Sequence, residues 1–161
     1  AAEECEWKAS EKSVGLALEV PESLPPVSGS ERWLGVVVEN LLTNAVKFSR
    51  AGGAVAVRLA HKGEGVQVTV FDSGIGIPQA DRARIFEKFF RASNHDATGA
   101  PGTGLGLAIC RHIVNRHGGR IWFESEEGRG TSFHFVVPTA KAGEPGGRPP
   151  AAVPVDEGRM R

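Results

Sequence analysis

One part of the chain places two amides and an ammonium group on the same side of an expected helix. Asn40, Asn44 and Lys47 are spaced i, i+4 and i+7 within residues 31–49, so their side chains project from one stripe. An amphipathic helix with a solvated polar face has the same pattern. A phosphate site is the functional alternative, because an asparagine oxygen suits Mg²⁺ and a lysine suits phosphate oxygens. The spacing alone leaves both interpretations open.

A carboxylate and two glycines follow an alternating strand. In the segment Asp72-Ser73-Gly74-Ile75-Gly76-Ile77-Pro78, the carboxylate stands at the strand end and the glycines let the backbone approach a flat ligand. Asp72 could accept a hydrogen bond from an adenine amino group. The alternative is a tight turn in which Pro78 opens the next helix.

A glycine-rich segment opens the last expected helix. The run Gly102-Thr103-Gly104-Leu105-Gly106-Leu107 would offer backbone amides and the positive end of the helix dipole to phosphate. It is neither a dinucleotide fingerprint nor a P-loop, because a loop from Arg91 to Pro101 precedes it and it lacks the Gly-Lys-Ser/Thr ending. A loop of that length before a phosphate cradle predicts a lid.

The elements that must position these groups combine hairpins with helices. The patterns predict helices at residues 1–12, 31–49, 78–90 and 105–117. Strands are expected at residues 16–20, 55–59, 66–70, 121–123 and 133–137. This order predicts an α+β fold, a two-layer α/β sandwich with a mixed, mostly antiparallel sheet and about three helices on one face. A Rossmann fold is disfavoured.

Length and composition limit the remaining possibilities. The 161 residues, 40% of them hydrophobic, suffice for one domain, expected at residues 1–138, and residues 139–161 form an Ala-, Pro- and Gly-rich tail expected to be disordered. Nineteen basic residues balance nineteen acidic ones, so no overall field favours nucleic acid. No apolar run approaches the roughly 18 residues of a membrane span. Cys5 and Cys110 lack metal-ligand spacing, which suits a reducing compartment.

Four segments together resemble a known family. In this order, ENLLTNAVKF, VFDSGIGIP, RIFEKFFRA and GTGLGLAIC resemble the N, G1, F and G2 boxes of the catalytic, ATP-binding domain of sensor histidine kinases. HGGRIWFESEEGRGTSFHFVVP resembles that domain's closing hairpin, so the likeness runs from about Ala9 to Pro138. It implies a Bergerat (GHKL) ATPase fold with ATP and Mg²⁺ as cofactors. That family's domain usually begins with a strand ahead of its first helix, so we expect residues to be missing upstream.

By motif position, the resemblance implies a role for each site residue. Asn44 would be the Mg²⁺ ligand with Asn40 beside it, Lys47 would bind phosphate, and Arg91 would reach the γ-phosphate. The adenine pocket would comprise Phe48, Asp72, Gly74, Gly76, Ile77 and, through water, Thr131. The amides of Gly102, Gly104 and Gly106 would hold the phosphates, with Thr103, Leu105 and Leu107 in the same nucleotide-binding segment. Phe86, Phe89 and Phe90 would serve as core aromatics and lid anchors.

The same resemblance implies transfer of the γ-phosphate to a histidine on a separate dimerisation and phosphoacceptor domain of the same kinase, in two-component signalling with a response regulator downstream. None of the five histidines has the context of a phosphoacceptor: they are His61, His95, His112, His117 and His134. All five are interpreted as structural or surface residues. Glu39 is rejected as a general base because it is turned about 100° from Asn40 on a helix.

Two alternatives to a histidine kinase remain open within the fold. One is a serine kinase of the anti-sigma-factor type, and the other is a regulatory pseudokinase that only binds ATP. We expect a cytoplasmic, monomeric domain without nucleic-acid or membrane contact. The signal, the cognate response regulator and any membrane segment of the parent protein lie outside these residues.

Overall fold

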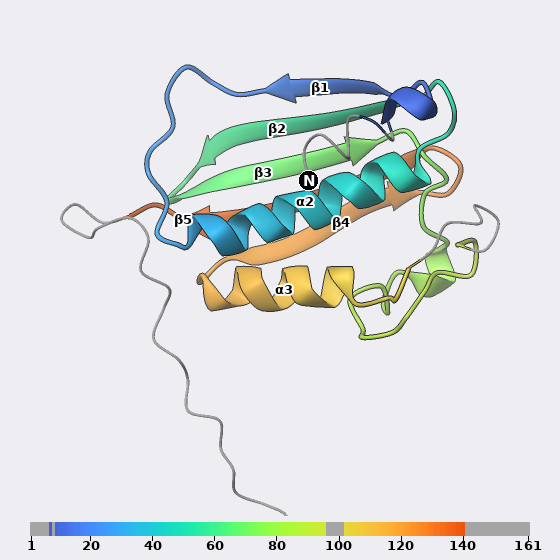
Figure 1. The fold of residues 1–161 in the computed structure, drawn as a ribbon. Coiled ribbons are helices and arrows are strands. Elements are labelled where there is room, and N and C mark those ends of the chain that lie inside the picture. Colours follow the sequence, from blue (N-terminus) through green and yellow to red (C-terminus); the bar gives the residue numbers. More distant parts are fainter. Residues whose placement is uncertain (1–6, 8, 96–101, 141–161) are drawn as a thin grey trace, which may run out of the picture.

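The computed structural model describes residue 7, residues 9–95 and residues 102–140, and within them a five-stranded sheet lies behind two α-helices (Figure 1). The helices are α2 (Glu31–Phe48) and α3 (Gly106–Arg116), with a short 3-10 helix, η1 (Gln79–Asp81). Residues 9–11 are also helical. The strands are β1 (Gly15–Glu19), β2 (Ala54–Lys62), β3 (Gly65–Asp72), β4 (Arg120–Glu126) and β5 (Gly130–Pro138).

The sheet is mixed and mostly antiparallel, as the sequence predicts. Its strand order is β1-β2-β3-β5-β4. Only the edge strand β1 runs parallel to its neighbour, whereas β2, β3, β5 and β4 pair antiparallel in turn. The register of β3 with β5 places Asp72 opposite Thr131. Two residues from distant motifs therefore meet at one end of the sheet.

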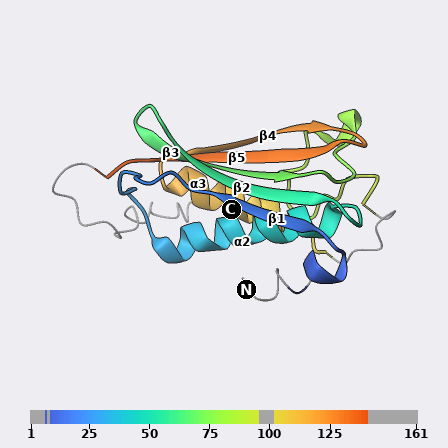
Figure 2. The ribbon, with the colours of Figure 1, turned by 90° about the horizontal axis from the view of Figure 1, so that it is seen from above.

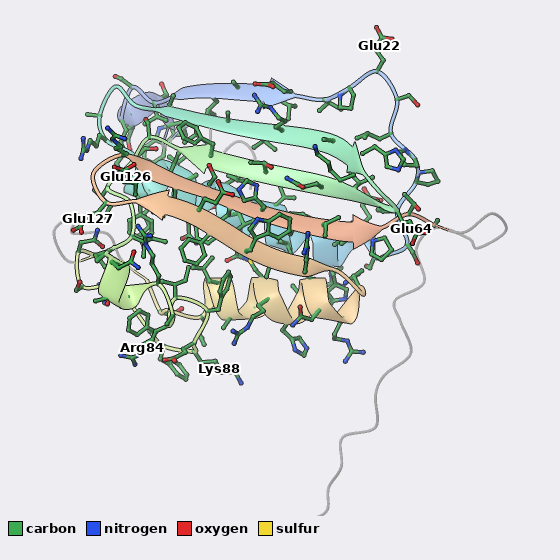
Figure 3. The ribbon with its side chains drawn as sticks, turned by 180° about the vertical axis from the view of Figure 1, so that it is seen from behind. Glu22, Glu64, Arg84, Lys88, Glu126 and Glu127 are labelled. Carbon is green, nitrogen blue, oxygen red and sulfur yellow. The ribbon has the colours of Figure 1, made fainter. Side chains whose placement is uncertain are left out.

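The core lies between the sheet and the two helices. Helix α2 packs over β2 and β3, α3 packs against β4 and β5, and the helices also contact each other. Val37 and Leu41 of α2 are fully buried, as is Val114 of α3. Both helices cover the same face of the sheet (Figure 2), and the opposite face is open in the view from behind (Figure 3). The prediction of a two-layer α+β sandwich is confirmed.

The prediction of a helix at residues 78–90 is wrong. Only η1 is helical there, and turns follow it, with Arg84 N–H donating to Asp81 O and Glu87 N–H to Arg84 O. At the end of the segment Phe89 has a left-handed backbone (φ 63°), and its N–H donates to Gly104 O instead of to the preceding turn. A contact with a distant segment thus replaces the local helical hydrogen bond.

Other details refine the predicted elements. Ser30 occupies the N-cap position of α2, but its side chain forms no cap hydrogen bond; its N–H donates instead to Nε2 of His117 at 3.1 Å. His117, which is buried, is therefore structural, as expected. Order extends past the predicted boundary at Pro138, since Thr139 N–H donates to Glu64 O and Ala140 N–H to Pro26 O. The remaining tail lies outside the described residues.

Among the helices described, none combines the length and the apolar composition that crossing a membrane requires.

Candidate nucleotide-binding site

A cavity of about 300 Å³ opens where the four sequence motifs meet. The C-terminal half of α2, the end of β3 with the loop after it, the segment after η1 and the start of α3 all contribute to its wall, and β5 closes it. These segments lie at one end of the sheet, to the right in Figure 1. The lining residues are Asn40, Thr43, Asn44, Lys47, Phe48, Asp72, Ile75, Gly76, Ile77, Ile85, Phe90, Arg91, Ala92, Asn94, His95, Gly102, Thr103, Gly104, Gly106, Leu107, Thr131 and Phe133.

The carboxylate of Asp72 is buried in the wall of this cavity. Asp72 is only 5% exposed, and its Oδ1 accepts a hydrogen bond from Gly74 N–H at 2.9 Å. Burial raises the pKa of Asp72 to about 6, and hydrogen bonds from the Gly74 and Thr131 amides oppose that rise. A buried acceptor at the wall of a cavity is suited to one specific donor on a ligand.

The loop after Asp72 is held close to the β4–β5 hairpin. Gly76 has φ 67°, and a Cβ atom there would overlap the carbonyl oxygen of Glu126, so only glycine fits. Ile77 N–H donates to Ser125 Oγ at 2.9 Å, and Ser125 Oγ lies 2.9 Å from Thr131 Oγ1. These contacts fix the hydroxyl of Thr131, whose residue is the cross-strand partner of Asp72.

The cavity wall also carries two cationic side chains with a histidine between them. Nη2 of Arg91 lies 2.6 Å from Nδ1 of His95, and Nζ of Lys47 lies 3.4 Å from Nε2 of the same ring. Arginine can only donate, so the 2.6 Å contact requires Nδ1 of His95 to accept. Desolvation, and then the charge of Arg91, lower the pKa of Lys47. An anion bound here would favour the charged form of that lysine.

The polar stripe of α2 faces this cavity. Asn40 Nδ2 donates to Val36 O at 2.9 Å within the helix, and Oδ1 of Asn40 lies against Gly106 at the start of α3. Asn44 and Lys47, farther along α2, also line the cavity. Asn40, Asn44 and Lys47 therefore share one cavity wall, and their role as metal and phosphate ligands stays a prediction. Glu39 is exposed outside the wall, as expected.

The glycine-rich segment approaches the wall through its backbone. A Cβ at Gly102 would fall 2.8 Å from Nζ of Lys47, so a side chain here would occupy the space in front of the ammonium group. Gly104 has φ 71° and packs directly on the backbone of Phe89 and Phe90. The first residues of α3 follow at once, and Gly106 and Leu107 line the cavity, so the N-terminus of α3 lies at the cavity wall.

The phenylalanines of the third motif divide between core and surface. Phe86 packs edge-on against Phe123 and Phe133, with ring centroids 6.0 and 6.4 Å apart. Phe90 lines the cavity, and the guanidinium of Arg84 lies 4.3 Å from its ring centroid. Phe89 is 72% exposed. The segment predicted to be a lid is described only as far as His95, and residues 96–101 lie outside the described part of the chain.

The cavity joins most of the residues singled out in the sequence. Gly74 and Leu105 lie outside its wall; Gly74 instead donates to the Asp72 carboxylate. The ring of Phe48, expected against adenine, lies beside Lys47 and His95 at centroid distances of 4.8 and 5.4 Å. Its contact with the base stays a prediction.

The sequence did not predict several of the residues that line the cavity. Asn94 and His95 are the polar ones near the lid, and His95 is only 6% exposed. Asn94 Nδ2 donates to Gly76 O at 3.0 Å, which connects the segment after Arg91 to the loop after β3. His95 follows Arg91 by four residues, and that spacing would have been the only sequence signal for their contact.

This fold and cavity, whose wall combines the buried Asp72 carboxylate with the cations Lys47 and Arg91, define an α/β sandwich of the nucleotide-binding class. Residues 29–141 match the family described as histidine kinase-, DNA gyrase B- and HSP90-like ATPases. The chain belongs to this family, and ATP binding follows from that membership.

Relatives within the family are sensor histidine kinases. The adaptive-response sensory kinase SasA of Crocosphaera subtropica is 41% identical over 130 residues, which cover 80% of this chain and 34% of the relative. The chain therefore spans about a third of that kinase. Two solved structures share the fold. ShkA in complex with AMPPNP has a TM-score of 0.75 and 35% identity over 88% of this chain and 29% of its own. ThkA in complex with the response regulator TrrA has a TM-score of 0.67 and 29% identity over 84% and 37%.

Proposed function

We propose that this chain is the catalytic part of a sensor histidine kinase, which binds Mg·ATP and transfers its γ-phosphate to a histidine of a separate dimerisation and phosphoacceptor domain. The observation that carries the proposal is the single cavity that unites Asp72 with Lys47 and Arg91. A response regulator would then receive the phosphate, as the ThkA complex with TrrA suggests for a related kinase. Because ATP is supplied in the cytoplasm, we place the domain there.

In the proposed complex, Asp72 accepts a hydrogen bond from the adenine amino group. A guanine base presents a carbonyl oxygen at that position, which a carboxylate would repel, so the site should favour ATP over GTP. Ser125 and Thr131 hold the floor of this pocket through their hydroxyl contact. Lys47, Arg91 and the amides of the glycine-rich segment hold the phosphates at the other end.

Transfer in this arrangement depends on positioning and charge neutralisation by the chain's own residues. The amide oxygen of Asn44 would hold Mg²⁺, which when bound neutralises charge on the phosphate oxygens. An asparagine suits that role because it adds no negative charge beside the triphosphate. Lys47 and Arg91 orient the terminal phosphates toward an incoming histidine nitrogen.

The deciding experiment incubates the chain with γ-labelled ATP and Mg²⁺, with and without a phosphoacceptor hairpin from its parent kinase. The chain alone should bind nucleotide and form no acid-labile, alkali-stable phosphohistidine, because none of its five histidines has phosphoacceptor context. Addition of the hairpin should produce that label. Acid-stable label on a partner protein would favour a serine kinase, and nucleotide binding without any transfer would favour the pseudokinase.

Substitution of Asn44 tests the metal role. Asn44→Asp should lower the rate of transfer to the added hairpin by about 100-fold, because the added negative charge disturbs the metal–phosphate geometry. Asn44→Ala should leave the melting temperature within a few degrees, since the side chain is half-buried on a polar stripe. Transfer rates and thermal melting give the two readings.

The exposed neighbour Glu39 supplies the control. Glu39→Gln lies on the same helix but outside the cavity, so it should change neither reading. If Asn44→Ala unfolds the domain, Asn44 is structural and the metal assignment is wrong.

A further inference from the structure

The last turn of α2 carries Lys47 and Phe48 into the nucleotide cavity, yet it lacks the usual helix stop. Helices commonly end with a glycine in the left-handed conformation that satisfies their last carbonyl groups. Here the C-cap is Ser49, with an extended backbone (φ −61°, ψ 148°). The final carbonyls of α2 therefore need a donor from elsewhere in the chain.

Lys12 supplies that donor from a segment far away in the sequence. Its Nζ donates to the carbonyl oxygen of Lys47 at 2.6 Å, and the oxygens of Val46 and Ser49 each lie 3.4 Å away. One ammonium group thus faces three carbonyls at the negative end of the α2 dipole, where a cation is stabilising. The short helix at residues 9–11 lies next to this end of α2 in both Figure 1 and Figure 2.

Hydrogen bonds and buried side chains fix the backbone on both sides of Lys12. Ala9 and Val14 are buried in the core, and Val14 N–H donates to Ala9 O at 2.8 Å. Gly52 N–H donates to Lys12 O at 3.1 Å, which ties the segment to the loop after α2. The turn that contains Lys12 therefore holds this residue next to the end of α2.

The end of α2 also contacts the loop after β3, which follows Asp72. The carbonyl oxygen of Phe48 accepts a hydrogen bond from Ile75 N–H at 3.2 Å, and Ser49 pairs with Gly74 in a β-bridge. A continuous series of contacts runs from Lys12 through the last turn of α2 to the loop beside Asp72. A displacement of that turn would move the Lys47 side chain in the cavity.

We propose that Lys12 is a positioning residue for the nucleotide site, which acts through the end of α2 to place Lys47 against the phosphates. This inference rests on the proposed function, since it takes Lys47 as a phosphate ligand. It also gives the segment that precedes β1 a direct mechanical connection to the phosphate end of the cavity.

The test measures Mg·ATP affinity of the whole chain by calorimetry, below the melting temperature of each variant. Lys12→Met should weaken binding about three- to tenfold, in the range of mutations that act on a site through an intervening element. Lys12→Arg, which keeps the charge and donors, should stay within about twofold of the unaltered chain. Lys62→Met, at an exposed lysine at the far end of β2, is the matched control and should have no effect.

A double-mutant cycle separates positioning from general stabilisation. If Lys12 acts through Lys47, Lys12→Met should cost less than about twofold in a Lys47→Met background. An equal loss in both backgrounds, or an unchanged affinity of Lys12→Met despite a lower melting temperature, would overturn the inference. If Lys12→Met does not fold, Lys12→Gln, which keeps one donor without the charge, takes its place in the cycle. Failure of the unaltered chain to bind ATP would instead refute the proposed function.

Discussion

Replacement of Asp72 by asparagine should weaken ATP binding about 100-fold and, at neutral pH, make the nucleotide-free domain more stable. The binding loss follows because the new amide group would place a donor opposite the adenine amino group, in a wall that is almost fully buried. Calorimetry with ATP and GTP measures this loss. The affinity for GTP, which the carboxylate disfavours, should fall less or rise.

The gain in stability follows from the raised pKa of Asp72. Its pKa is about 6 in the fold against the ordinary value of 3.8, so the fold favours the neutral form. As pH rises from about 4 to about 6, the unfolded chain loses this proton more readily than the folded one, and the folded state loses up to about 3 kcal/mol relative to the unfolded state. Above pH 6 that cost is constant. Asparagine has no charge to bury, and its oxygen can still accept from Gly74 N–H.

The measurement is the free energy of unfolding of both chains between pH 4 and pH 8. The difference between variant and unaltered chain should be near zero at pH 4 and should grow in favour of Asp72→Asn up to pH 6. Asp81→Asn is the control of opposite sign. Asp81 accepts from both N–H and Oγ of Ser93 at 2.7 Å, and these bonds lower its pKa, so its replacement should destabilise the domain at neutral pH. An Asp72→Asn variant that is less stable than the unaltered chain at pH 7 would contradict this account.

The parts of the site that sequence predicts best are those fixed by local geometry. The spacing of Asn40, Asn44 and Lys47 determines which side of a helix they share, and α2 forms where the pattern predicts it. Asp72 and the glycines after it depend on a strand end and a turn, which are also local. The local structure of each motif follows from its own residues. The fold then brings the motifs together in one cavity.

The parts that sequence predicted poorly depend on contacts between distant segments. Residues 78–90 have apolar spacing that suits a helix, but Phe86 packs against Phe123 of β4 and Phe133 of β5, and Phe89 N–H donates to Gly104 O. Propensity is a weak guide where such packing decides the backbone. The contact of Lys12 with the carbonyl oxygen of Lys47 spans 35 residues of sequence, and the periodicity of the sequence does not predict it.

Removal of the Arg91 side chain should separate transfer from binding. Arg91→Ala should lower the rate of phosphate transfer to an added phosphoacceptor hairpin by about 1,000-fold, because an arginine that meets the developing charge on a transferred phosphoryl group contributes that much or more. The affinity for Mg·ATP should fall less than about tenfold. Rate measurements at saturating ATP, alongside calorimetry, distinguish the two effects.

The small loss in affinity has a physical cause in the ligand-free cavity. The charge of Arg91 helps to lower the pKa of Lys47, so its removal strengthens the charged form of the remaining lysine and offsets part of the lost attraction for phosphate. Arg58→Ala, at an exposed arginine paired with Glu19 on β2 and β1, controls for the loss of one positive charge and should alter neither reading. Equal losses in affinity and transfer rate would show that Arg91 only binds the ground state, and an unchanged transfer rate would exclude it from the reaction.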